Sequence, residues 1–307
     1  MKKLFFIAIT IAFASCKTIK VSEKSAFQES KYKLEASSSY IKLSNKSENE
    51  KNTAIQALNK VIETQDTLIF NINEVELLRN FINHDNIKME YFVFKPKNIQ
   101  KIGVYFLGNT TNILNVTDYL IELSAQTNAK IYVLHYRGYG KSEGTPSFKS
   151  QFDDNNYFFK TLLASNQQID FVLGYSLGSV FATYAAIDNN IHNIFLLSPF
   201  SETKDYFTHF KNQSMKGGKS LLKPFVKITA DDYLLNISNI NKLKSFKGKL
   251  VIFHGKSDNI LPYTMGKKIY NSYISNTKKL YTIEGGNHSA AFQQDQWEQL
   301  INEINTL

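Results

Sequence analysis

The stretch IDFVLGYSLG, residues 169–178, decides how the rest of this 307-residue chain is interpreted. A short apolar run leads into the pattern Gly-x-Ser-x-Gly, and a helical pattern follows it. The apolar residues on one face of that helix are Leu177, Val180, Phe181 and Tyr184. This order predicts a strand, a sharp turn and a helix, with the serine at the turn. The two glycines would let the strand and the helix approach each other without Cβ clashes.

Ser176 is therefore the candidate nucleophile. The turn would raise its hydroxyl above the edge of a sheet, and the N-terminus of the following helix would favour a developing negative charge there. The alternative is an inert serine in a tight strand–helix turn, because a short motif of this kind also arises by chance.

Composition narrows the class of protein. With 307 residues, 43% of them hydrophobic, the chain is long enough for one large α/β domain with appendages or for two small domains. Its formal net charge is +9. No Lys/Arg block carries interleaved aromatic residues, so a nucleic-acid partner is not expected. The positive charge indicates a general bias towards lysine, or weak attraction to an anionic membrane surface.

The first residues have the layout of a signal peptide. Lys2 and Lys3 precede an apolar run over residues 4–14, which is too short to span a bilayer. Residues 13–16, Phe-Ala-Ser-Cys, resemble the cleavage box of bacterial lipoproteins, with Phe13 in place of the usual leucine. That resemblance implies removal of residues 1–15, lipidation of Cys16 and a membrane-anchored place in the cell envelope. An ordinary secreted protein, or a cytosolic one with an apolar start, is the alternative.

Residues 16–65 are predicted to form a polar tether and a lead-in to the folded domain. The part from residue 17 to 52 is rich in Ser, Lys, Glu and Asn, and is interpreted as a spacer that holds the domain off the membrane. Residues 53–62 have the spacing of a short helix. Cys16 is the only cysteine, so no intramolecular disulfide can form.

Strands and helices alternate through the rest of the chain. Besides the strand before Ser176, strands are predicted at residues 91–94, 102–107, 131–134, 194–197, 250–253 and 279–283. A turn is expected at residues 95–98, and helices at 113–126 and 148–163. This alternation predicts a mostly parallel sheet with helices on both faces, in which sites collect at the carboxyl ends of the strands.

From about residue 86 to 307 the chain resembles the α/β-hydrolase superfamily. More narrowly, it resembles the abhydrolase-domain branch, with the segment Tyr-Arg-Gly-Tyr-Gly-Lys-Ser-Glu-Gly-Thr-Pro-Ser at residues 136–147 and the loop Leu-Gly-Asn-Thr-Thr-Asn at residues 107–112. The resemblance implies an α/β-hydrolase domain over residues 66–307 with a short lid insertion at about 201–241. Leu107 replaces a family histidine, so we expect different packing of that loop.

A serine hydroxyl needs a base, and the base needs an orienting acid, which in this fold follow in the order Ser, acid, His. The strand at 250–253 ends in His-Gly-x-x-Asp-x-x-x-Pro, which resembles the family's acid loop and implies that Asp258 is the acid. A loop carboxylate that caps the helix near Tyr263 is the alternative. Asp231 and Asp232 are rivals, but no apolar strand precedes them.

His288 is the candidate base. It lies in Glu-Gly-Gly-Asn-His-Ser, residues 284–289, directly after the last predicted strand. There it would take the Ser176 proton and return it to the leaving group. The other histidines have weaker contexts: His135 stands where the family often has Asp, His254 belongs to the acid-loop turn, and no motif surrounds His84, His192 or His209.

An oxyanion hole needs two backbone N–H groups. We expect one from Leu177 and the other from Asn109, in the loop after the strand at 102–107. Residues 137–144 are interpreted as a structural loop. Tyr206, Phe207 and Phe210, in the predicted lid, are candidates for an apolar substrate pocket together with Tyr175, although such aromatics are more often core.

Cofactor motifs fail on spacing. Gly-Lys-Ser occurs at residues 140–142 and 218–220, but positions 135 and 213 lack the first glycine of a phosphate loop. Zinc-ligand spacing is absent. We therefore expect no cofactor and no metal.

The sequence as a whole predicts a lipid-anchored serine hydrolase that cleaves an ester or thioester of a small or acyl-lipid substrate through an acyl-enzyme. A peptidase or amidase with the same triad is one alternative. The other is a catalytically silent binding lipoprotein on a hydrolase scaffold, towards which only Leu107 points. The oligomeric state is left open.

Overall fold

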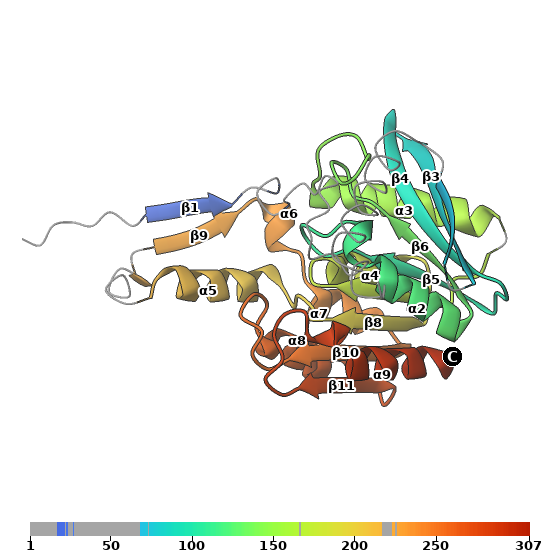
Figure 1. Ribbon diagram of the computed structural model, residues 1–307. Helices are drawn as coiled ribbons and strands as arrows, with labels where there is room; N and C mark the ends of the chain where they lie inside the picture. The colour runs from blue at the N-terminus through green and yellow to red at the C-terminus, as the bar shows by residue number, and fades with distance from the viewer. Residues whose placement is uncertain are drawn as a thin grey trace, which may run out of the picture.

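The computed structural model describes residues 17–21, 23, 27, 68–72, 74–165, 167–216, 223–224 and 226–307 (Figure 1). The predicted signal peptide, Cys16, the helix at 53–62 and most of the tether lie outside these residues. The description below concerns the described residues only.

A nine-stranded sheet runs through the described part of the chain, in the order β11-β10-β8-β7-β5-β6-β4-β3-β2. Six neighbouring strands are parallel: β5 (Lys101–Phe106), β6 (Ala129–Leu134), β7 (Phe171–Tyr175), β8 (Asn193–Leu197), β10 (Lys249–Gly255) and β11 (Lys278–Ile283). Their residues are mostly buried, as both faces of a parallel sheet are covered. The predicted, mostly parallel sheet is therefore confirmed.

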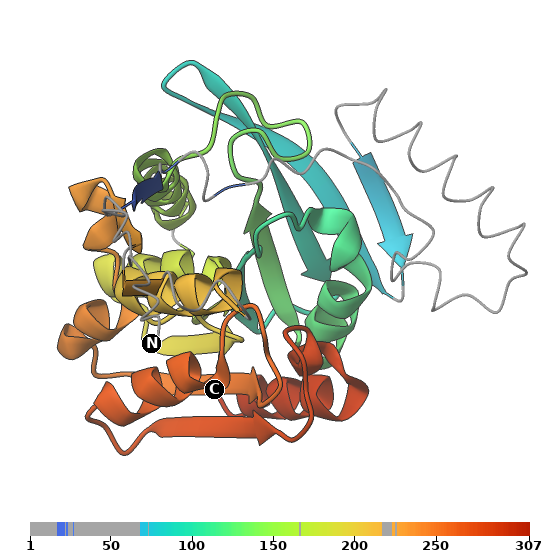
Figure 2. The ribbon, with the colours of Figure 1, turned by 90° about the vertical axis from the view of Figure 1, so that its left-hand side faces the viewer.

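An antiparallel extension completes the sheet. It consists of β2 (Leu68–Ile72), β3 (Val75–His84) and β4 (Ile87–Pro96), and β4 pairs with β6. Figure 2 shows it at one edge, with β11 at the opposite edge. The sequence reading missed β2 and β3. The predicted turn at 95–98 begins too early, because β4 continues through Pro96, which pairs with Val75 at the end of the ladder.

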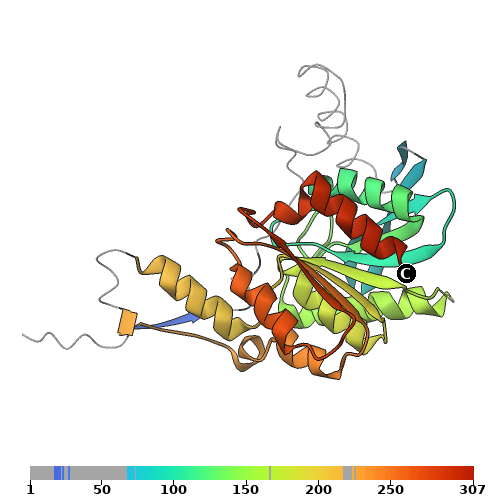
Figure 3. The same ribbon diagram turned by 90° about the horizontal axis from the view of Figure 1, so that it is seen from below.

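Helices cover both faces. On one face lie α2 (Thr117–Thr127) and α9 (Gln294–Asn305), and on the other α3 (Phe148–Ala164), α4 (Gly178–Asp188) and α8 (Tyr263–Ser272) (Figure 3). The helix predicted at 113–126 is divided. Asn112 forms a capping box with Asn115 that closes the short 3-10 helix η3 (Ile113–Asn115), so that α2 begins only at Thr117. No helix in the described ranges has both the length and the apolar character needed to cross a membrane.

The predicted lid range, 201–241, holds α5 (Thr203–Ser214), β9 (Val226–Ala230), α6 (Asp232–Leu235) and α7 (Asn239–Lys242). β9 pairs in parallel with β1 (Lys17–Val21), from the start of the chain. Together β1, α5 and β9 project from the body as an arm (Figure 1), which we call the cap arm.

The described residues of the predicted tether correct its interpretation as a spacer. β1 is fully paired with β9, and Phe27 is buried against the rings of Tyr136, Phe148 and Phe181. Val21 and Phe27, spread among polar residues, pack against the hydrophobic core and so attach these positions to the domain.

Candidate active site

Ser176 occupies the sharp turn between β7 and α4. Its φ is +53°, in the left-handed region that non-glycine residues rarely adopt. The surrounding packing holds this conformation: the Ser176 amide donates to the Leu197 carbonyl at 2.9 Å. A Cβ at Gly174 would lie 2.5 Å from the Gly178 carbonyl oxygen, and one at Gly178 would lie 2.2 Å from the Phe106 carbonyl oxygen. The predicted role of both glycines in close packing is thus confirmed.

The structure brings Ser176 and His288 together, although 112 positions separate them. The His288 Nε2 atom lies 2.9 Å from the Ser176 Oγ atom, and the His288 Nδ1 atom lies 2.7 Å from Asp258 Oδ2. A charged carboxylate can only accept, so Nδ1 carries the proton and donates it to Asp258. Nε2 is then left with a lone pair directed at the serine hydroxyl, the arrangement that general-base catalysis requires.

Asp258 is buried and held by more than His288. Its Oδ1 atom accepts from the amides of Ile260 at 2.9 Å and Leu261 at 3.0 Å. Burial by itself raises the pKa of Asp258, but hydrogen bonds from His254 and His288 outweigh it and hold the pKa well below its usual range. The carboxylate therefore stays charged. It does not cap α8, which has Pro262 at its N-cap position without a side-chain cap.

His254 fixes the acid loop, a role that the sequence reading did not assign. Its ring is fully buried, and Nε2 lies 2.8 Å from the Leu261 carbonyl oxygen and 3.3 Å from Asp258 Oδ2. The N–H on Nε2 is thus shared between the loop backbone and the carboxylate.

Two further contacts place the His288 loop. A Cβ at Gly255 would lie 2.3 Å from the Gly286 carbonyl oxygen, so the acid loop and the histidine loop touch along their backbones. Ser198, at the end of β8, donates its hydroxyl to the His288 carbonyl at 2.7 Å. Ser198 was also missed, and only its place directly after a predicted strand could have drawn attention to it.

The candidate oxyanion residues Leu177 and Asn109 both line a cavity beside Ser176. Leu177 lies at the N-terminus of α4, where the first amides of a helix have no intrahelical partner. Asn109 is held by its side chain: Oδ1 accepts from the Tyr139 hydroxyl at 2.8 Å and from the Thr110 amide at 3.1 Å.

The segment at 136–147 clamps the Asn109 loop. Besides the Tyr139 contact, the Tyr136 hydroxyl donates to the Leu107 carbonyl at 2.5 Å. Leu107 is fully buried in the core. The loop thus remains fastened through its backbone carbonyl.

A buried network of charged and polar side chains, Arg79, Glu90 and His135, lies next to this clamp. His135 Nδ1 lies 2.9 Å from Glu90 Oε2, and Arg79 Nε donates to Glu90 Oε1. Glu90 also accepts from the Lys141 amide at 2.9 Å. His135 Nε2 accepts from the Ile113 amide at 3.0 Å, so the ring joins the Tyr-Arg-Gly segment to the turn that follows the Asn109 loop. His135 therefore positions loops and does not line the cavity beside Ser176.

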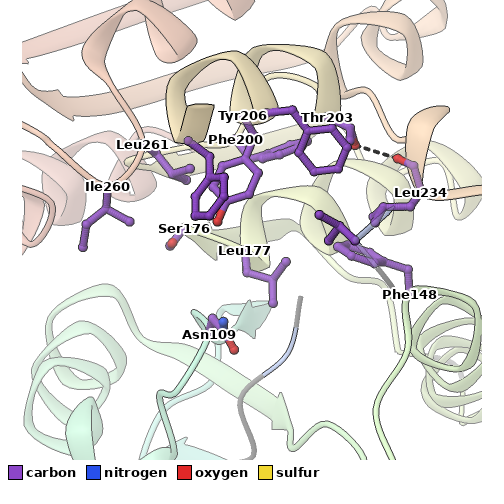
Figure 4. Close-up of a pocket in the computed structure, with 13 residues that line it drawn as sticks. Asn109, Phe148, Ser176, Leu177, Phe200, Thr203, Tyr206, Leu234, Ile260 and Leu261 are labelled. Atoms are coloured by element: carbon purple, nitrogen blue, oxygen red, sulfur yellow. Dashed lines mark hydrogen bonds between the residues drawn. The ribbon is translucent and has the colours of Figure 1, made fainter. Parts of the chain in front are cut away.

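Ser176 opens into a cavity of about 340 Å³ (Figure 4). Its lining is mostly apolar: Val21, Asn109, Phe148, Ser176, Leu177, Phe200, Thr203, Tyr206, Phe207, Phe210, Leu234, Ile260 and Leu261. The three aromatic residues predicted from the lid line it. Tyr175 does not: its ring lies against His288 and Phe292, and its hydroxyl lies 3.3 Å from Ser289 Oγ.

The rival acids lie elsewhere. Asp231 is the N-cap residue of α6 and pairs with Lys20 at 2.6 Å, and Asp232 begins α6. Within the described ranges, no group of three or more His, Cys, Asp or Glu side chains is arranged to hold a metal ion.

Similarity to known proteins, in sequence and in structure, indicates the α/β-hydrolase fold. The model of a family described as "alpha/beta hydrolase fold" matches residues 106–222. An uncharacterized Escherichia coli O157:H7 protein, YfhR, is 27% identical over 195 residues, 60% of this chain and 63% of its own. A putative alpha/beta hydrolase of Acanthamoeba polyphaga mimivirus, L404, is 29% identical over 187 residues, 58% of this chain and 64% of its own. The match thus spans less than two thirds of either relative.

Among solved structures, the Pyrococcus furiosus esterase Pf2001 superposes with a TM-score of 0.59 at 18% identity, covering 78% of this chain and 96% of the esterase. With the parallel sheet and its helices, these matches show that the chain has the α/β-hydrolase fold, and they support a hydrolase of that superfamily.

Proposed function

We propose that this protein is a serine hydrolase that cleaves an ester or thioester of a small or acyl-lipid substrate through an acyl-enzyme on Ser176. The observation that carries the proposal is the hydrogen-bonded chain from Ser176 through His288 to Asp258, with the serine facing an apolar cavity. The esterase among the similar structures supports it at the level of fold.

In the acylation step, His288 Nε2 takes the hydroxyl proton as Ser176 Oγ bonds to the substrate carbonyl carbon. The carbonyl π electrons move onto oxygen, and the amides of Leu177 and Asn109 donate to that oxyanion. Asp258 stabilises the imidazolium, because its carboxylate stays charged. The tetrahedral intermediate then expels the alcohol or thiol, which takes the proton from His288, and leaves the acyl group on Oγ.

Deacylation repeats the sequence with water. His288 accepts a proton from the water as its oxygen bonds to the acyl carbon. Collapse of the second intermediate breaks the bond to Ser176 Oγ, which recovers its proton from His288. The products are a carboxylic acid and the free enzyme.

The cavity lining indicates an apolar acyl group. Burial of one methylene contributes roughly 0.8 kcal/mol, so each added CH₂ is expected to raise kcat/KM about fourfold until the cavity is filled. A panel of p-nitrophenyl esters from acetyl upward measures this series. Flat values across the panel would place the acyl group outside the cavity.

Ser176→Ala tests the nucleophile, with Ser245→Ala, an exposed serine before β10, as the matched control. Ester hydrolysis and labelling by a fluorophosphonate probe are expected to disappear in Ser176→Ala only. Retained labelling would move the nucleophile elsewhere. Turnover of peptides instead of esters would indicate the peptidase, and no turnover by the unmodified protein would indicate a silent scaffold.

We further propose that the enzyme is a lipoprotein of the cell envelope, anchored through Cys16 after removal of residues 1–15. The support is the sequence pattern at residues 2–16. Metabolic labelling with an alkyne fatty acid in a bacterial host is expected to mark the protein, and Cys16→Ser is expected to abolish the label. Equal labelling of both chains would contradict the anchor.

A further inference from the structure

The cap arm is unusually basic. Three of its lysines, Lys204, Lys211 and Lys227, make no ion pair in the described part of the chain, and neither do Lys216 and Lys223 in the segment that joins α5 to β9. Some of the acidic groups beside them already have lysine partners. Lys268 of α8 pairs with Glu202 at 2.7 Å and with Asp205 at 2.9 Å, and Lys20 pairs with Asp231. The arm therefore carries a local excess of positive charge.

Exposed apolar side chains accompany this charge. Ile19 on β1 is 38% exposed, Phe210 on α5 is 42% exposed, and Ile260 in the acid loop is 54% exposed. Phe210 and Ile260 also line the cavity, and Ile260 is labelled in Figure 4. Lysines beside exposed apolar groups are the composition of surfaces that rest in the interface of a bilayer.

The position of β1 links this surface to the N-terminus. β1 begins at Lys17, one residue after Cys16, and ends at Val21, which lines the cavity. Adjacent Cα atoms are about 3.8 Å apart, so an anchor on Cys16 leaves no spacer between the membrane and the arm. Lys227 pairs across the ladder with Thr18, so it would then lie close to the membrane surface, where anionic lipids attract cations.

We propose that the cap arm docks on the surface of a lipid bilayer rich in anionic phospholipid, with the mouth of the cavity beside the membrane. This proposal rests on the proposed function for its purpose, because docking delivers membrane-borne acyl groups to Ser176. The nearness of the arm to the membrane rests on the proposed Cys16 anchor, whereas the preference for anionic lipid rests on the arm's charge and its exposed apolar groups.

The test measures binding of the full chain to vesicles of phosphatidylcholine, with and without phosphatidylglycerol, by co-sedimentation. The arm variant replaces four lysines by glutamine: Lys204, Lys211, Lys216 and Lys227. The control replaces four exposed lysines that lie near the amino ends of the parallel strands, away from the carboxyl ends where Ser176 and the cavity lie: Lys97, Lys160, Lys244 and Lys247. Both sets remove the same charge, and all chains share the same N-terminal segment.

The unmodified chain is expected to bind vesicles that contain phosphatidylglycerol at least about tenfold more tightly than neutral ones. The arm variant is expected to lose most of that preference, and the control to keep it. Equal losses in both variants would show an effect of net charge alone and overturn the proposal, as would the absence of any preference in the unmodified chain.

Hydrolysis of a soluble p-nitrophenyl ester separates the two proposals. Both variants are expected to turn it over at the unmodified rate, because none of the substituted lysines lines the cavity. If no chain hydrolyses any ester, the proposed function fails, and sedimentation still decides docking. If all chains hydrolyse the ester but the arm variant binds anionic vesicles like the control, docking fails and the hydrolase remains.

Discussion

The His288–Asp258 pair and the His135–Glu90 pair make the same contact at one ring nitrogen, but only His288 has a serine hydroxyl at the other. In the His288–Asp258 pair and in the His135–Glu90 pair, ring Nδ1 faces a carboxylate oxygen, at 2.7 and 2.9 Å. The difference lies at Nε2. The Ile113 amide donates to His135, and an amide does not give up its proton at neutral pH. The Ser176 hydroxyl lies at His288, where loss of its proton produces a nucleophile.

The surroundings follow the same division. His135 is fully buried, and Glu90 also binds Arg79, so this pair fastens loops. His288 is partly exposed, and the serine beside it opens into the cavity, so a substrate can reach it. A histidine–carboxylate pair is therefore a common structural element, and the third group together with access to it decides the role.

The largest expected effect is that of His288→Ala. Loss of the base should lower kcat/KM for p-nitrophenyl esters about 100,000-fold. The free energy of unfolding should fall by about 1.5–3 kcal/mol, because Asp258 loses one hydrogen bond but keeps those from His254, Ile260 and Leu261. Urea unfolding of the same preparation checks the second value. Residual activity within tenfold of the unmodified enzyme would remove His288 from the mechanism.

Asp258→Asn is expected to lower kcat about 10,000-fold. The amide cannot stabilise the imidazolium as a carboxylate does, and it favours the wrong tautomer of His288. Fluorophosphonate labelling of Ser176 should slow in parallel with ester turnover. A variant with full activity would mean that other groups orient His288. The Asp258 carboxylate would then have no catalytic role to set the pair apart from His135–Glu90.

His135→Ala is expected to affect stability more than chemistry. It leaves Glu90 buried with one partner fewer, at a cost of about 3 kcal/mol in the free energy of unfolding. Activity per folded molecule should fall less than tenfold, because only the clamp on the Asn109 loop is loosened. If kcat falls as far as in His288→Ala while the protein stays folded, the division between the two pairs is wrong.

Glu303 is a buried carboxylate without a histidine partner, and its replacement is expected to have the smallest effect of the changes considered. Burial raises its pKa, but hydrogen bonds from Lys249, Lys279 and Tyr281 outweigh this and lower the pKa to about 2. Its stabilisation is therefore present above the ordinary pKa of 4.5 and is lost as the pH falls towards about 2.

Asp258, whose pKa is also lowered, contributes with the same sign. The free energy of unfolding should therefore fall between about pH 5 and 3, and less steeply in Glu303→Gln. Chemical unfolding at several pH values measures the slopes. Identical slopes in both chains would mean that the lysine contacts do not hold Glu303 charged.

Most of the central sheet was predictable because β5, β7, β8 and β10 contain apolar runs and most of its parallel strands lead into a motif. β2 and β3 were not, since β3 alternates buried and half-buried residues and contains Arg79, which is buried only because Glu90 lies beside it on β4. Pairing between a strand and residues far along the chain leaves no local signal. The same reason hid β1, whose partner β9 is about two hundred positions away.

By itself, the sequence determined which residue types follow which strands: a serine between two glycines, an aspartate after His-Gly and a histidine after Gly-Gly-Asn. Local sterics and hydrophobic periodicity depend on neighbouring residues, so they can be predicted from a short stretch of sequence. Only the tertiary structure decided that His288 reaches Ser176 whereas His135 is enclosed, that Tyr175 lies outside the cavity, and that β1 joins the cap arm. Each of these depends on distances between segments that only the packing of the whole chain fixes.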